Sequence, residues 1–227
     1  MASRWLPLES NPDVINAYLR KLGIAEKWKC VDVYGFDDEI LSMVPKPVAA
    51  LMLLFPITDK YESHAKDEAG KLGGQAPSDV YFIKQSIENA CGTIAIIHAL
   101  ANNEKRIDLG NGCFKKFLDL SKASKPEERA SLLEKDEELT RAHEDSAGEG
   151  QTRAPPRDAK VDLHFITFVN VNGNLFELDG RKLAPIAHGS TSDDTLLKDA
   201  AAICKKFIER EPENLNFTAL AIAADSA

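Results

Sequence analysis

The sequence lacks a long apolar run. The longest one, Val48–Phe55, has eight residues, whereas a helix that crosses a membrane needs about 20. The first residues, Met1 to Trp5, include no apolar stretch of signal-peptide length. We therefore predict a cytoplasmic protein that does not enter a membrane.

Cysteine is scarce, and no two cysteines are close in sequence. The chain has four, Cys30, Cys91, Cys113 and Cys204, and no CxxC pair. Structural zinc sites and disulfide frameworks usually require such spacing, and isolated cysteines in a reducing compartment stay free thiols. We therefore expect neither a metal site nor a disulfide.

Basic residues are fewer than acidic ones. The chain has 28 Lys and Arg residues against 36 Asp and Glu, which gives a net charge of −8. This balance argues against nucleic acid as a partner and would suit a basic ligand. The length of 227 residues and the 44% hydrophobic content are those of one globular domain, so we expect residues 1–227 to form a single unit.

Apolar periodicity and turn residues predict a mixture of helices and strands that do not alternate regularly. This mixture favours an α+β fold over a doubly wound parallel sheet. The expected helices are 12–22, 37–44, a fraying helix within 59–79, 89–103, 112–122, 126–142 and 193–211; the expected strands are 31–34, 48–55, the hairpin 162–183 and 215–223, with 80–84 extended.

Residues 143–160 show no apolar periodicity. A structureless segment of this length inside a compact domain is usually a lid, a binding loop or a disordered stretch.

Cys91 is the first candidate for chemistry. Asn89 is a favourable residue to cap the helix that follows, so Cys91 would lie in its first turn. The positive end of a helix dipole lowers the pKa of a thiol there and favours the nucleophilic thiolate. Gly92 would leave room beside the sulfur for a substrate backbone. The alternative is a small buried core cysteine, which is what most single cysteines are.

The hairpin supplies a partner for that thiol. Asn172-Gly173 is the preferred pair for a two-residue type I′ turn. A turn centred there places His164 and Asp179 on one face of the hairpin as diagonal neighbours on the two strands. The backbone positions of such neighbours are about 7–8 Å apart, a distance that two polar side chains can bridge. A shift of the register by one residue would put them on opposite faces, and His164 could then be a stray strand histidine.

Together these residues have the chemistry of a nucleophile, a base and a group that orients the base. Cys91 would attack a carbonyl, His164 would hold its proton, and Asp179 would fix the imidazole tautomer. Gln85, six residues before Cys91, carries an amide that could stabilise an oxyanion, although it could also be an ordinary polar loop residue.

The remaining histidines and cysteines are weaker candidates. His98 lies about 10 Å along the helix from Cys91, too far for direct proton transfer, and is expected to be a packing residue. His64 and His143 are in polar stretches and are expected to be solvated, and His188 is expected in a loop or a cap. The other three cysteines have apolar neighbours and are expected to be structural.

At these residues the chain resembles the ubiquitin carboxyl-terminal hydrolase family, especially its short single-domain members. The resemblance covers four motifs in order, from about residue 4 to residue 223. They are Trp5-Leu6-Pro7-Leu8-Glu9-Ser10-Asn11-Pro12, Gln85-Ser86-Ile87-Glu88-Asn89-Ala90-Cys91-Gly92-Thr93, Leu163-His164-Phe165 and Glu177-Leu178-Asp179-Gly180-Arg181-Lys182.

The resemblance implies a papain-like fold with three α-β-α layers, in which helices flank a central antiparallel sheet and the backbone is knotted. It implies a monomeric, thiol-dependent hydrolase without a cofactor, which cleaves amide, ester or thioester adducts at the C-terminal glycine of ubiquitin. Residues 143–160 would be the family's crossover loop above the active site, so small or unfolded leaving groups are expected.

The resemblance also implies contacts with ubiquitin. They carry over to Trp5, Pro7, Glu9, Asn11 and Asp32. Ubiquitin's tail is basic, so carboxylates are suitable partners for it. Trp5 could equally anchor the N-terminal segment onto the sheet. Arg153 departs from the acidic residue of close relatives in the family, so the resemblance does not extend to a salt bridge from this position.

Three alternatives remain at this point. One is the same chemistry on a ubiquitin-like modifier such as NEDD8, which the sequence does not distinguish. Another is a ubiquitin-binding module without catalysis. The presence of all four catalytic residues argues against this alternative. The third is a general papain-like protease, which would have an open cleft where the long loop predicts a covered one.

Overall fold

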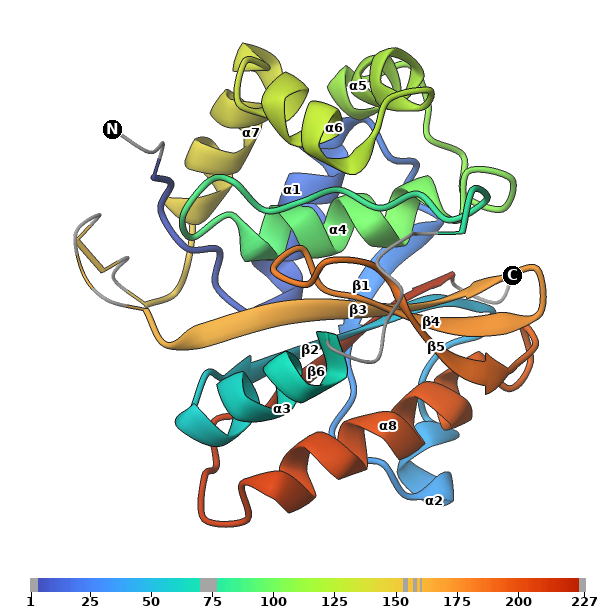
Figure 1. Cartoon of the computed structure of the whole chain (residues 1–227). Coiled ribbons are helices and arrows are strands. Elements are labelled where there is room, and N and C mark those ends of the chain that lie inside the picture. The colour runs from blue at the N-terminus through green and yellow to red at the C-terminus, as the bar shows by residue number, and fades with distance from the viewer. Residues whose placement is uncertain (1–3, 70–76, 153–154, 157–158, 160, 225–227) are drawn as a thin grey trace.

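The computed structural model describes residues 4–69, 77–152, 155–156, 159 and 161–224. A six-stranded antiparallel sheet runs through its centre, with the strand order β1-β6-β2-β3-β4-β5 (Figure 1). The strands are β1 (Trp28–Asp32), β2 (Val48–Pro56), β3 (Leu163–Val171), β4 (Asn174–Leu178), β5 (Ile186–Ser190) and β6 (Thr218–Ala224). The first and last strands in the chain are therefore neighbours in the sheet.

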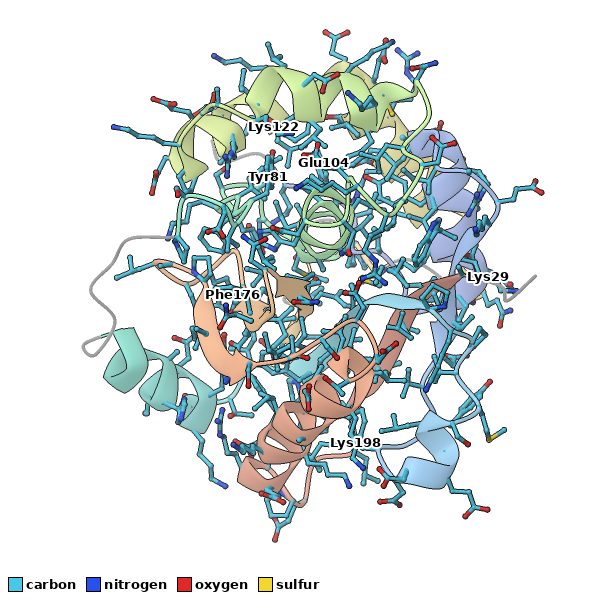
Figure 2. The ribbon with its side chains drawn as sticks, turned by 90° about the vertical axis from the view of Figure 1, so that its right-hand side faces the viewer. Lys29, Tyr81, Glu104, Lys122, Phe176 and Lys198 are labelled. Carbon is cyan, nitrogen blue, oxygen red and sulfur yellow. The ribbon has the colours of Figure 1, made fainter. Side chains whose placement is uncertain are left out.

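Helices cover both faces of the sheet (Figure 1). One layer contains α1 (Pro12–Leu22), α4 (Cys91–Ala101), α5 (Cys113–Ser121), α6 (Pro126–Leu133) and α7 (Glu137–Ala147); the other contains α2 (Asp38–Leu41), α3 (Asp59–Ala69) and α8 (Leu196–Arg210). In the rotated view, Tyr81, Glu104 and Lys122 lie in the first layer and Lys198 lies in the second (Figure 2). The predicted α+β fold with α-β-α layers is confirmed.

Strand β2 is the wall between the two cores. Its side chains alternate, so that Met52 packs in the core under α4 while Leu51 and Leu53 pack in the core under α8. Because both faces are covered, the strand is a continuous apolar run, as the sequence predicts. Among the described residues, no helix is long and apolar enough to cross a membrane.

The β3–β4 hairpin has the predicted turn and register. Asn172 and Gly173 both have positive φ, 50° and 80°, as a type I′ turn requires. Val171 pairs with Asn174, and the ladder continues in that register to Thr167 and Leu178. His164 and Asp179 lie just beyond the end of this ladder, and their side chains meet, as the predicted shared face requires.

Several predicted boundaries are wrong. Strand β1 covers 28–32 rather than 31–34, helix α2 is shorter than the predicted 37–44, and β5 has no counterpart in the prediction. β5 was missed because its sequence, Ile-Ala-His-Gly-Ser, has only one strongly apolar residue and most of its residues are exposed. It lies at the sheet edge, where burial does not dictate composition.

The predicted loop 143–160 begins too early. Residues 143–147 form the last part of helix α7, which ends at Ala147. Asp136 caps the helix, and small residues such as Ala142, Ser146 and Ala147 face the core, a stripe too weakly apolar to be recognised from periodicity. Arg153 lies outside the described residues.

Candidate active site

Cys91 is the first residue of helix α4. The residue before the helix is Ala90, which provides no side-chain cap. Asn89 is therefore not the predicted cap; it adopts φ 64°, and its side-chain amide donates to the carbonyl of Trp5 at 3.1 Å. Cys91 is therefore one position nearer the start of the helix than predicted, which brings its sulfur nearer the positive end of the dipole. Only 9% of Cys91 is exposed.

Gly92 has a different role from the one predicted. A Cβ atom at this position would meet the side chain of Leu8 at 3.1–3.2 Å. The glycine therefore lets the N-terminal segment pack against the start of α4, and it does not reserve space for a substrate.

His164 and Asp179 form the predicted hydrogen bond. Nε2 of His164 lies 2.7 Å from Oδ1 of Asp179, and both side chains are buried. The backbone N–H of Arg181 donates to the same carboxylate oxygen at 2.9 Å. Because Nε2 is engaged by Asp179, Nδ1 is the ring nitrogen of His164 that is left to serve the Cys91 thiol.

The three ionisable groups shift one another's pKa. Burial alone would raise the pKa of Cys91, but its hydrogen bond with His164, the charge of His164 and the N–H groups of Phe165 and Gly92 lower it overall. Burial opposes the charged form of His164, yet Asp179 and Cys91 raise its pKa to about 9. The pKa of Asp179 is lowered, against burial, mainly by the charge of His164. The site thus stabilises the thiolate of Cys91 and the imidazolium of His164 together.

Gln85 lies beside the thiol on the segment that leads into α4. Its backbone N–H donates to the carbonyl of Gly180 at 2.9 Å, which ties it to the Asp179 turn. One amide hydrogen is directed to the carbonyl of Ile87, with Nε2 3.3 Å from that oxygen. A primary amide has two N–H groups, so the second is available to an oxyanion.

A cavity of 580 Å³ lies over these residues. Cys91, His164 and Gln85 form one side, and Pro7 and Glu9 of the N-terminal segment form another. Thr152, Pro155 and Val161, from the segment between α7 and β3, also line the cavity. This is where the crossover loop was predicted to pass.

Not all the predicted ubiquitin contacts line this cavity. Pro7 and Glu9 do. Trp5 is 3% exposed, with its ring 4.3 Å from that of His143, so in this structure it anchors the N-terminal segment to α7. Asn11 caps α1 and its amide lies 3.4 Å from the Glu9 carboxylate. Asp32 lies at the end of β1, on the far edge of the sheet from β3.

The other histidines divide between correct and wrong predictions. His98 is buried, accepts a hydrogen bond from the N–H of Ile83 at 3.1 Å and has a pKa lowered by burial to about 3, as a packing residue should. His64 is exposed, as predicted. His188 is in β5 rather than a loop, and its Nε2 lies 2.8 Å from Glu177.

The prediction for His143 is wrong, because it is fully buried. Its Nε2 lies 2.7 Å from the carbonyl of Leu6, and its Nδ1 lies 2.8 Å from the hydroxyl of Thr93. It therefore links the N-terminal segment, α7 and α4. A polar stretch of sequence does not reveal such burial, because its neighbours on the exposed side of α7 determine the local composition.

Sequence analysis missed one residue at the site altogether. Tyr61 of α3 donates its hydroxyl to Oδ2 of Asp179 at 2.5 Å, inside the protein. No motif marks this tyrosine, which lies in a charged segment predicted only as a fraying helix.

Among the described residues, no group of three or more His, Cys, Asp or Glu side chains is placed to hold a metal ion.

Comparisons with known proteins point to one family. A family model described as ubiquitin carboxyl-terminal hydrolase, family 1, matches residues 5–209. The chain is similar to a ubiquitin carboxyl-terminal hydrolase of Drosophila melanogaster (47% identity, covering 97% of each chain) and to the human isozyme L1 (47% identity, covering 95% of this chain and 96% of that one).

A solved structure agrees with these sequence matches. It is the UCH37 catalytic domain of Trichinella spiralis bound to ubiquitin vinyl methyl ester. This chain is similar to it with a TM-score of 0.79 and 25% identity, over 99% of this chain and 97% of that one.

Proposed function

The chain belongs to the ubiquitin carboxyl-terminal hydrolase family, and from this premise we propose that it hydrolyses adducts at the C-terminal glycine of ubiquitin with Cys91 as nucleophile. The observation that carries the proposal is the buried His164–Asp179 hydrogen bond beside a thiol at the start of α4. The relative bound to ubiquitin vinyl methyl ester supports ubiquitin as the substrate.

The proposed chemistry has two steps. The Cys91 thiolate attacks the carbonyl carbon of the C-terminal glycine, and the imidazolium of His164 gives its proton to the departing amine, alcohol or thiol. Water then attacks the thioester while His164 accepts its proton as base. Ubiquitin leaves with a free carboxylate, and the proton on His164 restores the Cys91 thiol. Asp179 holds the imidazole through Nε2 in both steps.

Gln85 would stabilise the oxyanion that forms in each step. Its second amide hydrogen is the donor, since the first is directed to the carbonyl of Ile87. A donor that is already oriented needs little reorganisation in the transition state, and removal of one such donor costs about 3 kcal/mol in comparable sites.

Ubiquitin's basic tail would enter beside Glu9. This carboxylate lines the cavity next to Cys91, and Asn11 helps to orient it. Thr152, Pro155 and Val161 line the same cavity and would restrict what can hang from the tail, so we propose small or unfolded leaving groups. Trp5, Asn11 and Asp32 remain proposed contacts or supports on the strength of the resemblance.

Two further properties are proposed with the function. All the candidate catalytic residues come from one chain, so we propose that it acts as a monomer. The four cysteines are free thiols, which suits a reducing compartment such as the cytoplasm.

The test is reaction with ubiquitin that carries an electrophilic group at its C-terminus, followed by mass spectrometry. We expect one adduct on Cys91 and none on Cys91→Ala. Cys113→Ala is a matched control, because Cys113 is partly exposed, and it should label like the wild type. Binding of ubiquitin without an adduct would favour the binding module, and preferential labelling by the NEDD8 equivalent would favour the other modifier.

A further inference from the structure

Asp179 is held from two sides. Its Oδ1 faces His164 and also accepts from the backbone N–H of Arg181, at 2.7 and 2.9 Å. Its Oδ2 accepts from the hydroxyl of Tyr61 at 2.5 Å. Tyr61 is 8% exposed and Asp179 is 1% exposed, so water is poorly placed to replace the hydroxyl.

We propose that Tyr61 is a positioning residue for the reaction. Its hydroxyl fixes the plane of the Asp179 carboxylate, so that Oδ1 stays directed at His164. The proposal rests on the proposed function, because it acts through Asp179 on the His164 imidazole. A hydroxyl bound to Oδ2 prevents the carboxylate from turning about its Cβ–Cγ bond.

The hydroxyl has a second effect of opposite sign. By donating to Oδ2, it draws some negative charge away from Oδ1, which by itself would weaken the attraction for the imidazolium. Orientation is the larger effect, because a carboxylate that turns away loses the short charge-assisted bond as a whole.

Helix α3 is docked independently of this hydroxyl. The ring of Tyr61 packs against Phe55, with centroids 4.8 Å apart, and Phe55 in turn contacts the ring of His164. Glu62 forms an ion pair with Arg181 at 2.7 Å, and Thr58 donates to Glu211 at 2.5 Å. A phenylalanine at position 61 would keep the ring and these contacts, and would remove only the hydrogen bond.

Several other charged or titratable groups face this pair. His164 and the backbone of Arg181 bind Asp179 directly. The field of Asp179 also reaches Lys84 and His98, and Tyr61 lies in the field of Glu177 and the Arg181 side chain. All of these groups are unchanged in Tyr61→Phe, so a difference in the pH profile would come from the hydroxyl.

The first expected result is a loss of kcat. Hydrolysis of ubiquitin bearing a C-terminal fluorogenic amide should show kcat reduced about tenfold or more in Tyr61→Phe, with KM within about twofold, as for loss of one hydrogen bond to a charged group. Tyr81→Phe is the matched control. Tyr81 is 7% exposed, and its hydroxyl forms a hydrogen bond with that of Ser121 at 2.7 Å. It lies near Glu104 and Lys122 in the first helical layer (Figure 2). Its kcat should be that of the wild type.

The second expected result is a narrower pH profile. A less well-held imidazolium loses its proton at lower pH, and the thiolate beside it is protonated at higher pH. Both limbs of kcat/KM should therefore move inwards in Tyr61→Phe. A merely structural tyrosine would lower the melting temperature without moving either limb, and an unchanged or broader plateau would overturn the proposal.

A double mutant separates this proposal from the assignment of Asp179. If Tyr61 acts through Asp179, Tyr61→Phe should lower kcat no further in an Asp179→Asn background. If Asp179→Asn itself leaves kcat unchanged, the proposed role of Asp179 fails, and the Tyr61 proposal fails with it. If Asp179→Asn lowers kcat while Tyr61→Phe changes neither kcat nor the pH limbs, only the Tyr61 proposal is overturned.

Discussion

At the scale of single residues, the chemistry depends on two opposite charges that are buried together. The pKa of Cys91 is lowered although burial opposes this, and the pKa of His164 is raised to about 9. Below the pKa of Cys91 the thiolate is protonated, and above about 9 the imidazolium loses its proton. The pair therefore exists only between these two values, which belong to the coupled pair rather than to either residue.

We predict a plateau of kcat/KM between an acid limb below the usual thiol pKa of about 8.5 and an alkaline limb near pH 9. The rate of alkylation of Cys91 by iodoacetamide should rise with the acid limb. In His164→Ala the thiol loses its counter-ion while burial remains, so alkylation should shift to higher pH. A single rise near the ordinary thiol pKa in the wild type would contradict the ion pair.

The histidines illustrate what sequence reveals about single residues. His164 could be placed because turn chemistry sets the register of the hairpin and the register sets its partner. His143 could not, because its partners are Thr93 and the carbonyl of Leu6, which are remote in sequence. Tyr61 was missed for the same reason: its contact with Asp179 joins helix α3 to the residue after β4, 118 positions away in sequence.

At the scale of elements, the segment after α7 is attached to the N-terminal segment in the absence of substrate. The N–H and the hydroxyl of Thr152 both donate to Oε2 of Glu9, each at 3.1 Å. Gly150 lies so close that a Cβ atom would clash with the same carboxylate. Glu9 is also the proposed partner of ubiquitin's basic tail, so the tail and Thr152 compete for one carboxylate.

We therefore predict that Thr152→Val lowers KM for a ubiquitin substrate roughly two- to threefold and leaves kcat unchanged. The substitution removes the hydroxyl bond but keeps the N–H bond, so the segment should be easier to displace; exposed hydrogen bonds contribute about 1 kcal/mol or less. Steady-state kinetics measure the effect. Thr140→Val is the control, since its hydroxyl bonds the carbonyl of Asp136 within α7. A raised KM for Thr152→Val would mean that the contact assists binding.

Elements with strong local signals were predicted well from the sequence. Helix α1 begins after Asn11 and ends at Gly23, which adopts φ 96°, as its cap residues indicate. Strand β2 and the β3–β4 hairpin were also placed correctly. The C-terminal part of helix α7 and strand β5 were not. The buried face of that part of α7 is made of Ala, Ser and His, and the edge strand β5 is mostly exposed, so neither has a marked apolar period.

At the scale of the whole molecule, the sheet brings together parts of the site that are far apart in sequence. Cys91 begins a helix on one face, His164 lies on β3, and Tyr61 comes from the opposite helical layer. The layers could be predicted from the order of elements and apolar patterns. Their meeting at Asp179 could not, because it depends on how α3 packs below the sheet.

Charge acts at this scale too. The net charge of −8 should attract a ligand with a basic tail over distances longer than any single contact. Because the Debye length falls from about 30 Å at 0.01 M salt to about 8 Å at 0.15 M, kcat/KM for a ubiquitin substrate should fall roughly threefold between about 0.02 and 0.3 M NaCl. Glu9→Gln should show a higher KM and a shallower salt dependence, since one of the attracting charges is gone.

Alkylation of Cys91 by neutral iodoacetamide serves as the internal control for the salt experiment. The thiolate–imidazolium pair is buried, so salt screens it little, and the alkylation rate should stay nearly constant over the same range. If alkylation and kcat/KM fell together, salt would be acting on the site itself. If kcat/KM stayed flat or rose with salt, ubiquitin would be recognised without help from the acidic surface, and Glu9 would lose its proposed role.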